Sequence, residues 1–153
     1  MRRTDREIVD RETIDSILNE AEVSRIGMSN ENIPYVVAVN FGYDGENIYF
    51  HSANEGKKID ILKKNKVVCF EVEARTEIIK SEVACRWGMR YLSVIGMGKA
   101  EFIGELALKK KALNIIMGKY AKGINFDYTE TELNKIEVIK IAITEITGKK
   151  SGY

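Results

Sequence analysis

The stretch MRYLSVIGMGKAEFI, residues 89–103, carries the most regular pattern in the chain. From Leu92 to Phe102, every second residue is apolar or glycine, whereas the residues between them are of mixed character. Alternation with a period of two predicts a β-strand with one buried face. Gly96 and Gly98 both fall on this face, which indicates a tight bend or a close backbone approach, as at the corner of a small barrel.

Five further segments have the character of strands and are separated by turn residues. Asp44-Gly45 is a strong hairpin signal because glycine accepts the positive φ that the turn needs. Residues 74–83 are more polar and predict an irregular excursion. The five segments read EVSRIGMS, PYVVAVNFGY, NIYFHS, KVVCFEVE and IEVIKIAITEITGKK.

Helical patterns lie beside these strands and do not alternate with them. Asp10 can cap a first helix, and residues 54–64 form a short second one with apolar positions on one side. Residues 104–122 predict a longer helix, with residues 109–111 as a solvated lysine face. Its expected buried stripe is Leu108, Ala112, Leu113, Ile116 and Tyr120. The pattern predicts a mainly β protein, a small antiparallel barrel of about six strands with peripheral helices, and excludes a doubly wound sheet.

Composition indicates one globular domain over residues 1–153. Hydrophobic residues make up 44% and charged residues 31% of the chain, and the net charge is +1. No overall field favours nucleic acid or an anionic membrane, so an anion site must be local. The basic start has no apolar segment behind it, and no apolar run approaches a membrane span, which predicts a cytoplasmic protein. Cys69 and Cys85 lack the spacing of a metal site, and Cys69 is expected to be buried or half-buried.

The stretch IYFHSANEGKKIDILKK, residues 48–64, predicts a strand that leads into a helix near Asn54 or Glu55. Free N–H groups and the positive end of the helix dipole would then face outward, with Lys57 and Lys58 in the first turn. Lysines at this place oppose the dipole unless an anion is bound there, which favours a phosphate site. The alternative is an exposed helix with a lysine-rich face, and the motif alone does not decide between them.

Three other residues have both a functional and a structural interpretation. His51, the only histidine, could contact a ligand or donate a proton, and without a second histidine it is a poor metal anchor. Trp87 could line the binding site of a planar ligand, anchor a subunit interface or be buried in the monomer. Asn40 could bind a ligand or satisfy a neighbouring backbone group. No nucleophile elbow, phosphate-binding loop or dinucleotide fingerprint is present.

The chain as a whole resembles the pyridoxamine 5'-phosphate oxidase-like flavoproteins, and within them the nitroimidazole-resistance group. The resemblance runs through RRTDREI, PYVVAVNFGYDG, IYFHSANEGKKIDIL, VCFEVE, WGMRYLSVIGMGKAEF and EITGKKS in matching order and spacing. It implies a six-stranded antiparallel split β-barrel with peripheral helices, which forms a homodimer with one flavin mononucleotide (FMN) at each of two symmetric interfaces.

The resemblance also implies roles for individual residues. Lys57 and Lys58 would hold the FMN phosphate, His51 and Ser52 would help to place the phosphate and ribityl chain, and the backbone of residues 36–40 would lie against the ring. The full set of cofactor-binding residues implied in this way is Val36, Val37, Ala38, Val39, Asn40, His51, Ser52, Lys57, Lys58, Trp87, Arg90, Ser93 and Lys149. His51 is in addition the candidate catalytic residue, and no metal is expected.

The sequence departs from true pyridoxamine phosphate oxidases, because Tyr35 and Asn40 stand where those enzymes have a basic pair. The expected function is therefore an FMN-dependent oxidoreductase that passes electrons from a donor, such as a nicotinamide, to a small planar acceptor. The first alternative is a flavin- or haem-binding protein that stores or senses its ligand. The second is a dimeric barrel that binds another protein.

Overall fold

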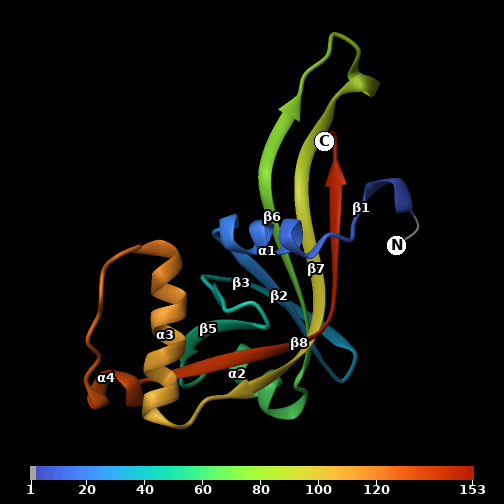
Figure 1. Ribbon diagram of the computed structural model, residues 1–153. Helices are drawn as coiled ribbons and strands as arrows, with labels where there is room; N and C mark the ends of the chain where they lie inside the picture. The colour runs from blue at the N-terminus through green and yellow to red at the C-terminus, as the bar shows by residue number, and fades with distance from the viewer. Residues whose placement is uncertain (1–2) are drawn as a thin grey trace.

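The computed structural model describes residues 3–153, so Met1 and Arg2 of the basic start lie outside the described residues. One antiparallel sheet has the strand order β3-β2-β6-β7-β8-β5-β4, and β1 pairs with β8 (Figure 1). The strands are β1 Glu7–Ile8, β2 Ser24–Asn30, β3 Ile33–Val39, β4 Gly42–Tyr43, β5 Asn47–Ala53, β6 Val67–Ile79, β7 Gly88–Phe102 and β8 Ile136–Ser151. The helices are η1 Thr4–Arg6, α1 Arg11–Glu20, α2 Lys57–Lys64, η2 Ala84–Arg86, α3 Leu106–Tyr120 and α4 Glu130–Asn134. None of the helices in the described chain is long and apolar enough to span a bilayer.

The mainly β, antiparallel class predicted from the sequence is confirmed, but the sheet has eight strands and not six. The six expected strands correspond to the six long ones, except that the strand expected over residues 34–43 ends at Val39 and its last two residues form β4. The other two, β1 and β4, have two residues each. A strand of two residues is too short to show a periodic pattern, so it is recognised only by its pairing with a neighbouring strand.

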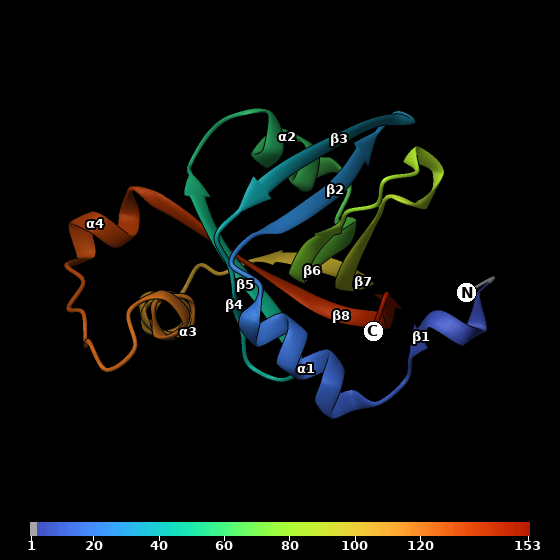
Figure 2. The same ribbon diagram turned by 90° about the horizontal axis from the view of Figure 1, so that it is seen from above.

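Seen from above, the strands curl around a common core, and α1 covers one side of it (Figure 2). The alternation in β7 is confirmed, because Leu92, Val94 and Ala100 are buried. Gly96 and Gly98 allow close approach: a Cβ on Gly96 would overlap the Phe70 ring, and the pairing of β7 with β8 shifts between Met97 and Gly98. Of the two expectations for these glycines, the close backbone approach is therefore present.

The predicted start of α1 is also confirmed, since the Asp10 carboxylate accepts a hydrogen bond from the Thr13 N–H at 2.8 Å. Ile14, Ile17 and Leu18 form its buried side. In α2 the three apolar residues Ile59, Ile61 and Leu62 are buried as expected.

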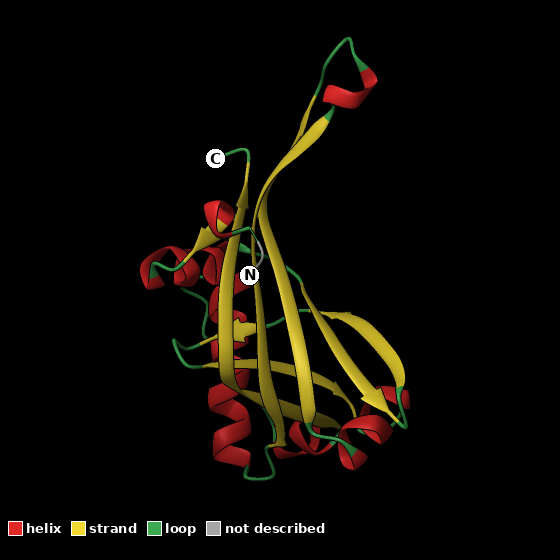
Figure 3. Ribbon diagram, turned by 90° about the vertical axis from the view of Figure 1, so that its right-hand side faces the viewer, coloured by secondary structure: helices red, strands yellow, loops and turns green. Residues whose placement is uncertain are grey.

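The irregular excursion expected over residues 74–83 is wrong for residues 74–79, because β6 continues as a strand to Ile79, and only residues 80–83 are irregular. A bulge at Arg75, whose φ is 53°, breaks the alternation that would have revealed the strand. The last pair that includes β8 is Tyr91 with Ser151, and beyond it β6 and β7 pair only with each other as far as Ile79 and Gly88. This two-stranded extension and its tip, residues 77–90, project from the barrel and are called the arm (Figures 1 and 3).

The side of the sheet that faces away from the core has a group of exposed apolar residues. We call it the outer face and define it by Val36, Val67, Cys69, Ile95 and Met97. The expectation that Cys69 is buried or half-buried is wrong. Cys69 lies between Val68 and Phe70, both of which point into the core, so the pleat directs its thiol to the outer face.

The expected buried stripe of α3 needs three corrections. Leu108 and Tyr120 are exposed, and Lys109, assigned to the solvated face, is only 7% exposed. The Lys109 ammonium donates hydrogen bonds to the carbonyl oxygens of Leu133 at 3.0 Å and Ile136 at 2.8 Å. These carbonyls belong to the end of α4 and the start of β8, so this lysine ties α3 to both elements.

We expect Lys109→Met to lower the free energy of unfolding by about 1–3 kcal/mol, because it leaves two carbonyls without their donor while keeping most of the side-chain volume. Urea unfolding monitored by circular dichroism measures this loss. Lys110→Met, on the exposed side of the same helix, is the control and should change stability by less than about 0.5 kcal/mol. Equal effects of the two substitutions would contradict the assigned role of Lys109.

Candidate functional site

The candidate site begins where β5 ends at Ala53 and α2 starts at Lys57. The sequence predicts that the helix starts at Asn54 or Glu55, but in the structure it starts two to three residues later, at Lys57. The reason is Gly56, whose φ of 119° and ψ of 164° favour glycine and are not helical. The helix can therefore begin only after Gly56, at Lys57. Lys57 and Lys58 are the first two residues of α2, so their expected place in the first turn is confirmed.

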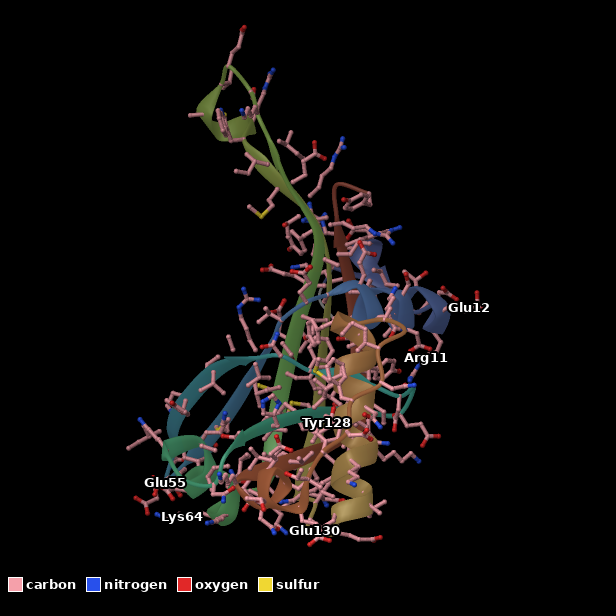
Figure 4. All side chains as sticks on the ribbon, turned by 90° about the vertical axis from the view of Figure 1, so that its left-hand side faces the viewer. Arg11, Glu12, Glu55, Lys64, Tyr128 and Glu130 are labelled. Carbon is pink, nitrogen blue, oxygen red and sulfur yellow. The ribbon has the colours of Figure 1, made fainter. Side chains whose placement is uncertain are left out.

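The start of α2 is open. No side chain caps it, and a Cβ built on Gly56 would meet no heavy atom within 4 Å. The first N–H groups of a helix lack partners within the helix, and together with the dipole they attract an anion. Glu55 and Lys64, which flank and end α2, lie at the surface, at the end of the molecule opposite the arm (Figure 4).

Positive charge gathers at this helix start, where Asp60 in the first turn and Glu55 before the helix are the nearby carboxylates in the sequence. None of the ion pairs formed by residues 3–153 includes Lys57 or Lys58. Burial lowers the pKa of the Lys58 ammonium. Burial, and in addition the charge of Lys58, lowers the pKa of the His51 imidazole from its usual value near 6.5. A phosphate beside these two groups would favour the protonated form of each.

Strand β3 lies beside the helix start. The Lys57 ammonium is 4.5 Å from the centre of the Tyr35 ring, and the Lys58 ammonium is 5.7 Å from the centre of the Phe50 ring. Because β3 is at the edge of the sheet, one side of its backbone has no strand partner. The exposed Val36, Ala38 and Asn40 alternate with Val37 and Val39, which pack against the core. In residues 36–40 the structure therefore offers both a free backbone edge and an open face.

Asn40 is exposed directly after β3, so its amide has no need of a partner inside the core. Ser52 is partly buried on β5 next to the exposed His51. Thus His51, Ser52, Lys57, Lys58 and β3 come together at one end of the barrel.

Four of the candidate residues lie elsewhere in the same chain. Trp87 and Arg90 belong to the arm, whereas α2 is at the opposite end of the molecule (Figures 1 and 3). Trp87 is 52% exposed, so the interpretation that it is buried in the monomer is wrong. Ser93 is buried in β7 directly opposite Lys149 of β8, whose ammonium is 5.6 Å from the centre of the Tyr91 ring.

Two features of the site were missed in the sequence. Tyr35 contacts Lys57 and joins β3 to α2, a pairing between distant residues that no local pattern indicates. The outer face has a weak signal, because Ile95 and Met97 occupy odd positions of a strand whose even positions form the core. An exposed apolar group of this kind is typical of an interaction surface.

Comparisons with known proteins agree with this geometry. The family model described as pyridoxamine 5'-phosphate oxidase matches residues 10–150. The solved structure of a protein of Bacteroides thetaiotaomicron that is described as a 5-nitroimidazole antibiotic resistance protein is 35% identical, with a TM-score of 0.85 over 94% of this chain and 86% of that one. A search of curated proteins gives no match.

Two more distant structures share the fold. The flavocytochrome Anf3 of Azotobacter vinelandii is 21% identical, with a TM-score of 0.86 over 100% of this chain and 72% of that one. An FAD- and haem-binding protein of Mycobacterium smegmatis is 18% identical, with a TM-score of 0.87 over 97% and 74% of the two chains. At this level of identity the likeness supports the flavin-binding split-barrel fold.

Proposed function

Because the chain belongs to the pyridoxamine 5'-phosphate oxidase family, we propose that it is an FMN-dependent oxidoreductase of the nitroimidazole-resistance type. The observation that carries the proposal is the placement of the Lys57 and Lys58 ammonium groups, neither of them in an ion pair, beside His51 at an uncapped helix start. A phosphate group satisfies both the charge and the free N–H groups. Cys69 and Cys85 are free and exposed, which supports a reducing, cytoplasmic location.

Each part of the site has its own task in this proposal. Lys57 and Lys58 hold the phosphate of FMN, and Ser52 donates a hydrogen bond near it. The edge and open face of residues 36–40 support the ring. When bound, the flavin supplies the electron transfer to a small planar acceptor. The protein contributes binding, orientation and exclusion of water.

His51 is proposed to donate a proton to the acceptor. In the free protein its lowered pKa keeps the imidazole mostly neutral at pH 7. Burial lowers this pKa most and the charge of Lys58 lowers it further; a phosphate anion beside Lys58 offsets the second effect, so the protonated form becomes more stable. Binding of the cofactor thereby prepares the proton donor.

The site is proposed to be completed by a second copy of the chain. The outer face adjoins β3, and exposes Val36, Ile95 and Met97 to solvent in a single chain. Exposed apolar groups of this kind are typical of surfaces that associate. A homodimer that covers the outer face would also cover the open face of β3, where the ring is proposed to lie.

The visible spectrum of the purified protein, followed by mass analysis of any chromophore released on denaturation, tests the function. We expect released FMN and oxidation of a nicotinamide when a nitroaromatic acceptor is present. Released haem, or FMN without turnover across donors and acceptors, would favour a storing or sensing protein. A colourless protein that is not stabilised by added FMN would overturn the flavin assignment and leave a protein-binding barrel.

Titration of His51 provides an independent test, because a single histidine gives a single imidazole Cε1–H signal in proton NMR. Without flavin, the signal should titrate below about pH 6.5. Adding FMN should move the titration to higher pH, since the phosphate favours the protonated imidazole. Riboflavin, which lacks the phosphate, is the matched control and should raise the pKa less. A pKa that falls or stays constant with FMN would contradict the proposed position of the phosphate.

A further inference from the structure

We infer that a pocket between α3 and the barrel is a second binding site, and that its ligand is a small apolar monocarboxylate with a single ring. Helix α3 lies outside the barrel, against β4, β5 and β8 (Figure 2). The pocket has a volume of about 320 Å³, at the lower end of the range of small-molecule sites. None of the residues assigned to flavin lines it, so the inference does not rest on the proposed function.

One wall of the pocket is a single face of α3. Leu108, Lys111, Ala112 and Ile115 are three or four residues apart, so they lie on the same side of the helix, and all four line the pocket. Leu108 is exposed and Ile115 is only partly buried, although both are large apolar residues. An apolar ligand in the pocket would remove from water the side chains that the fold itself leaves uncovered.

The opposite wall is formed where β7 ends. Phe102 and Ile103 line the pocket and are partly exposed. The Ile103 N–H donates a hydrogen bond to the Val138 carbonyl oxygen at 2.9 Å, which holds this end of the chain against β8. Gly104 follows, and a Cβ built on it would meet no heavy atom within 4 Å. The two apolar walls therefore enclose an open space, which is wide enough for a flat ring.

The charged groups that line the pocket carry a net charge of +1. Lys140 and Glu101 are directly opposite each other on β8 and β7 and form an ion pair of 2.7 Å. Lys111 lines the pocket from α3, and no ion pair within the described part of the chain includes it. Two cations and one carboxylate leave one positive charge, which matches a monoanion. A phosphate dianion would be repelled more strongly by Glu101.

Tyr49 adds an aromatic surface to the pocket without adding charge. It is opposite Lys140 in the pairing of β5 with β8, and its hydroxyl donates a hydrogen bond to Asp44 Oδ2 at 2.8 Å. Burial, and in addition this bond to Asp44, raises the pKa of Tyr49 to about 12, so the phenol is neutral at pH 7. The Asp44 carboxylate is also held by the backbone N–H groups of Glu46 and Asn47, in the turn before β5.

These walls define how the ligand lies. Its carboxylate is bound by Lys111 from the helix and by Lys140 from the sheet, and its ring packs between Leu108 and Phe102. Bound in this way, it joins α3 to β8.

The first test is a titration with cinnamate, followed by amide NMR in the presence of saturating FMN. We expect the signals of residues 101–104 and 108–115 to shift, and those of residues 36–40 and 57–58 to stay unchanged. Cinnamamide has nearly the same size but no charge, and should bind about threefold to fivefold more weakly, as expected for a partly exposed ion pair. Shifts confined to the flavin-site residues, or shifts in neither group, would overturn the inference.

The second test uses three variants. Lys111→Met should weaken the binding of cinnamate about threefold to fivefold and leave that of cinnamamide unchanged, because only the acid is charged. Lys110→Met removes the same charge from the neighbouring residue, which does not line the pocket, and should leave both affinities unchanged. Glu101→Gln removes the negative charge and should tighten the binding of cinnamate. All three side chains are exposed, so circular dichroism should show folded proteins.

The variants give results that contradict the inference as clearly as they support it. Equal effects of Lys111→Met and Lys110→Met, or weaker binding of cinnamate by Glu101→Gln, would overturn it. The proposed flavin function is tested separately. A protein that binds cinnamate at this pocket but binds no FMN would overturn that function and leave the second site in place.

Discussion

Replacing Lys57 and Lys58 together by alanine will weaken FMN binding on the order of 100-fold to 10,000-fold, because each charge-assisted hydrogen bond to a phosphate contributes about 1.5–3 kcal/mol. The two ammonium groups are the first residues of α2 and have no carboxylate partner among the ion pairs of residues 3–153. Isothermal titration with FMN measures the change. Riboflavin affinity should fall much less, since riboflavin has no phosphate.

The matched control is Lys63→Ala with Lys64→Ala, which removes the same charge from the exposed last turn of the same helix. We expect its FMN affinity to stay within about threefold of wild type, because charges separated by more than about 8–10 Å in solvent are largely screened at physiological salt. The stability of the flavin-free protein should not fall in the Lys57/Lys58 variant, since lysines at a helix start oppose the dipole. Equal losses of affinity in the two double variants would show a general charge effect and contradict a phosphate site.

The largest effect on stability is expected from Gly96→Ala. The added Cβ would overlap the buried Phe70 ring and approach the Glu145 carbonyl oxygen to 2.8 Å, so both the core and the β7–β8 pairing must shift. Overpacking of this kind costs up to about 3 kcal/mol. In a protein of this size the melting temperature should then fall by roughly 6–12 °C, which differential scanning calorimetry measures.

Gly118→Ala is the opposite case and serves as the control. Gly118 lies in α3, where a Cβ would meet no heavy atom within 4 Å. Alanine is favoured over glycine in a helix by about 1 kcal/mol, so the melting temperature should rise by a few degrees. A Gly96→Ala protein as stable as wild type would contradict the close approach of Phe70 and Glu145 to Gly96.

Much of the fold could be predicted because its causes are local. The alternation in β7, the Asp10 cap of α1 and the apolar residues of α2 are all visible in short stretches of sequence, and the structure has each of them. The two-residue strands and the continuation of β6 after Arg75 have no such signal. They depend on pairing between distant segments and on a bulge that interrupts the period.

The candidate site likewise has a part that local sequence predicts and a part that depends on distant segments. His51, Ser52, Lys57 and Lys58 are close in sequence, so a strand leading into a helix is enough to bring them together. Lys109 shows the limit of such reasoning, because three consecutive lysines have the same local character and only the position of α4 decides which one is buried.

The sequence by itself determined the antiparallel β class and the cluster of basic residues at the start of α2, because periodicity, turns and helix ends act over a few residues. Only the tertiary structure decided that Tyr35 contacts Lys57, that Cys69 and Met97 share an exposed face, and that Trp87 is in an arm at the opposite end from the helix start. These relations depend on which strands pair and how far each extends. Pairing is a long-range choice, set by the burial of the core as a whole.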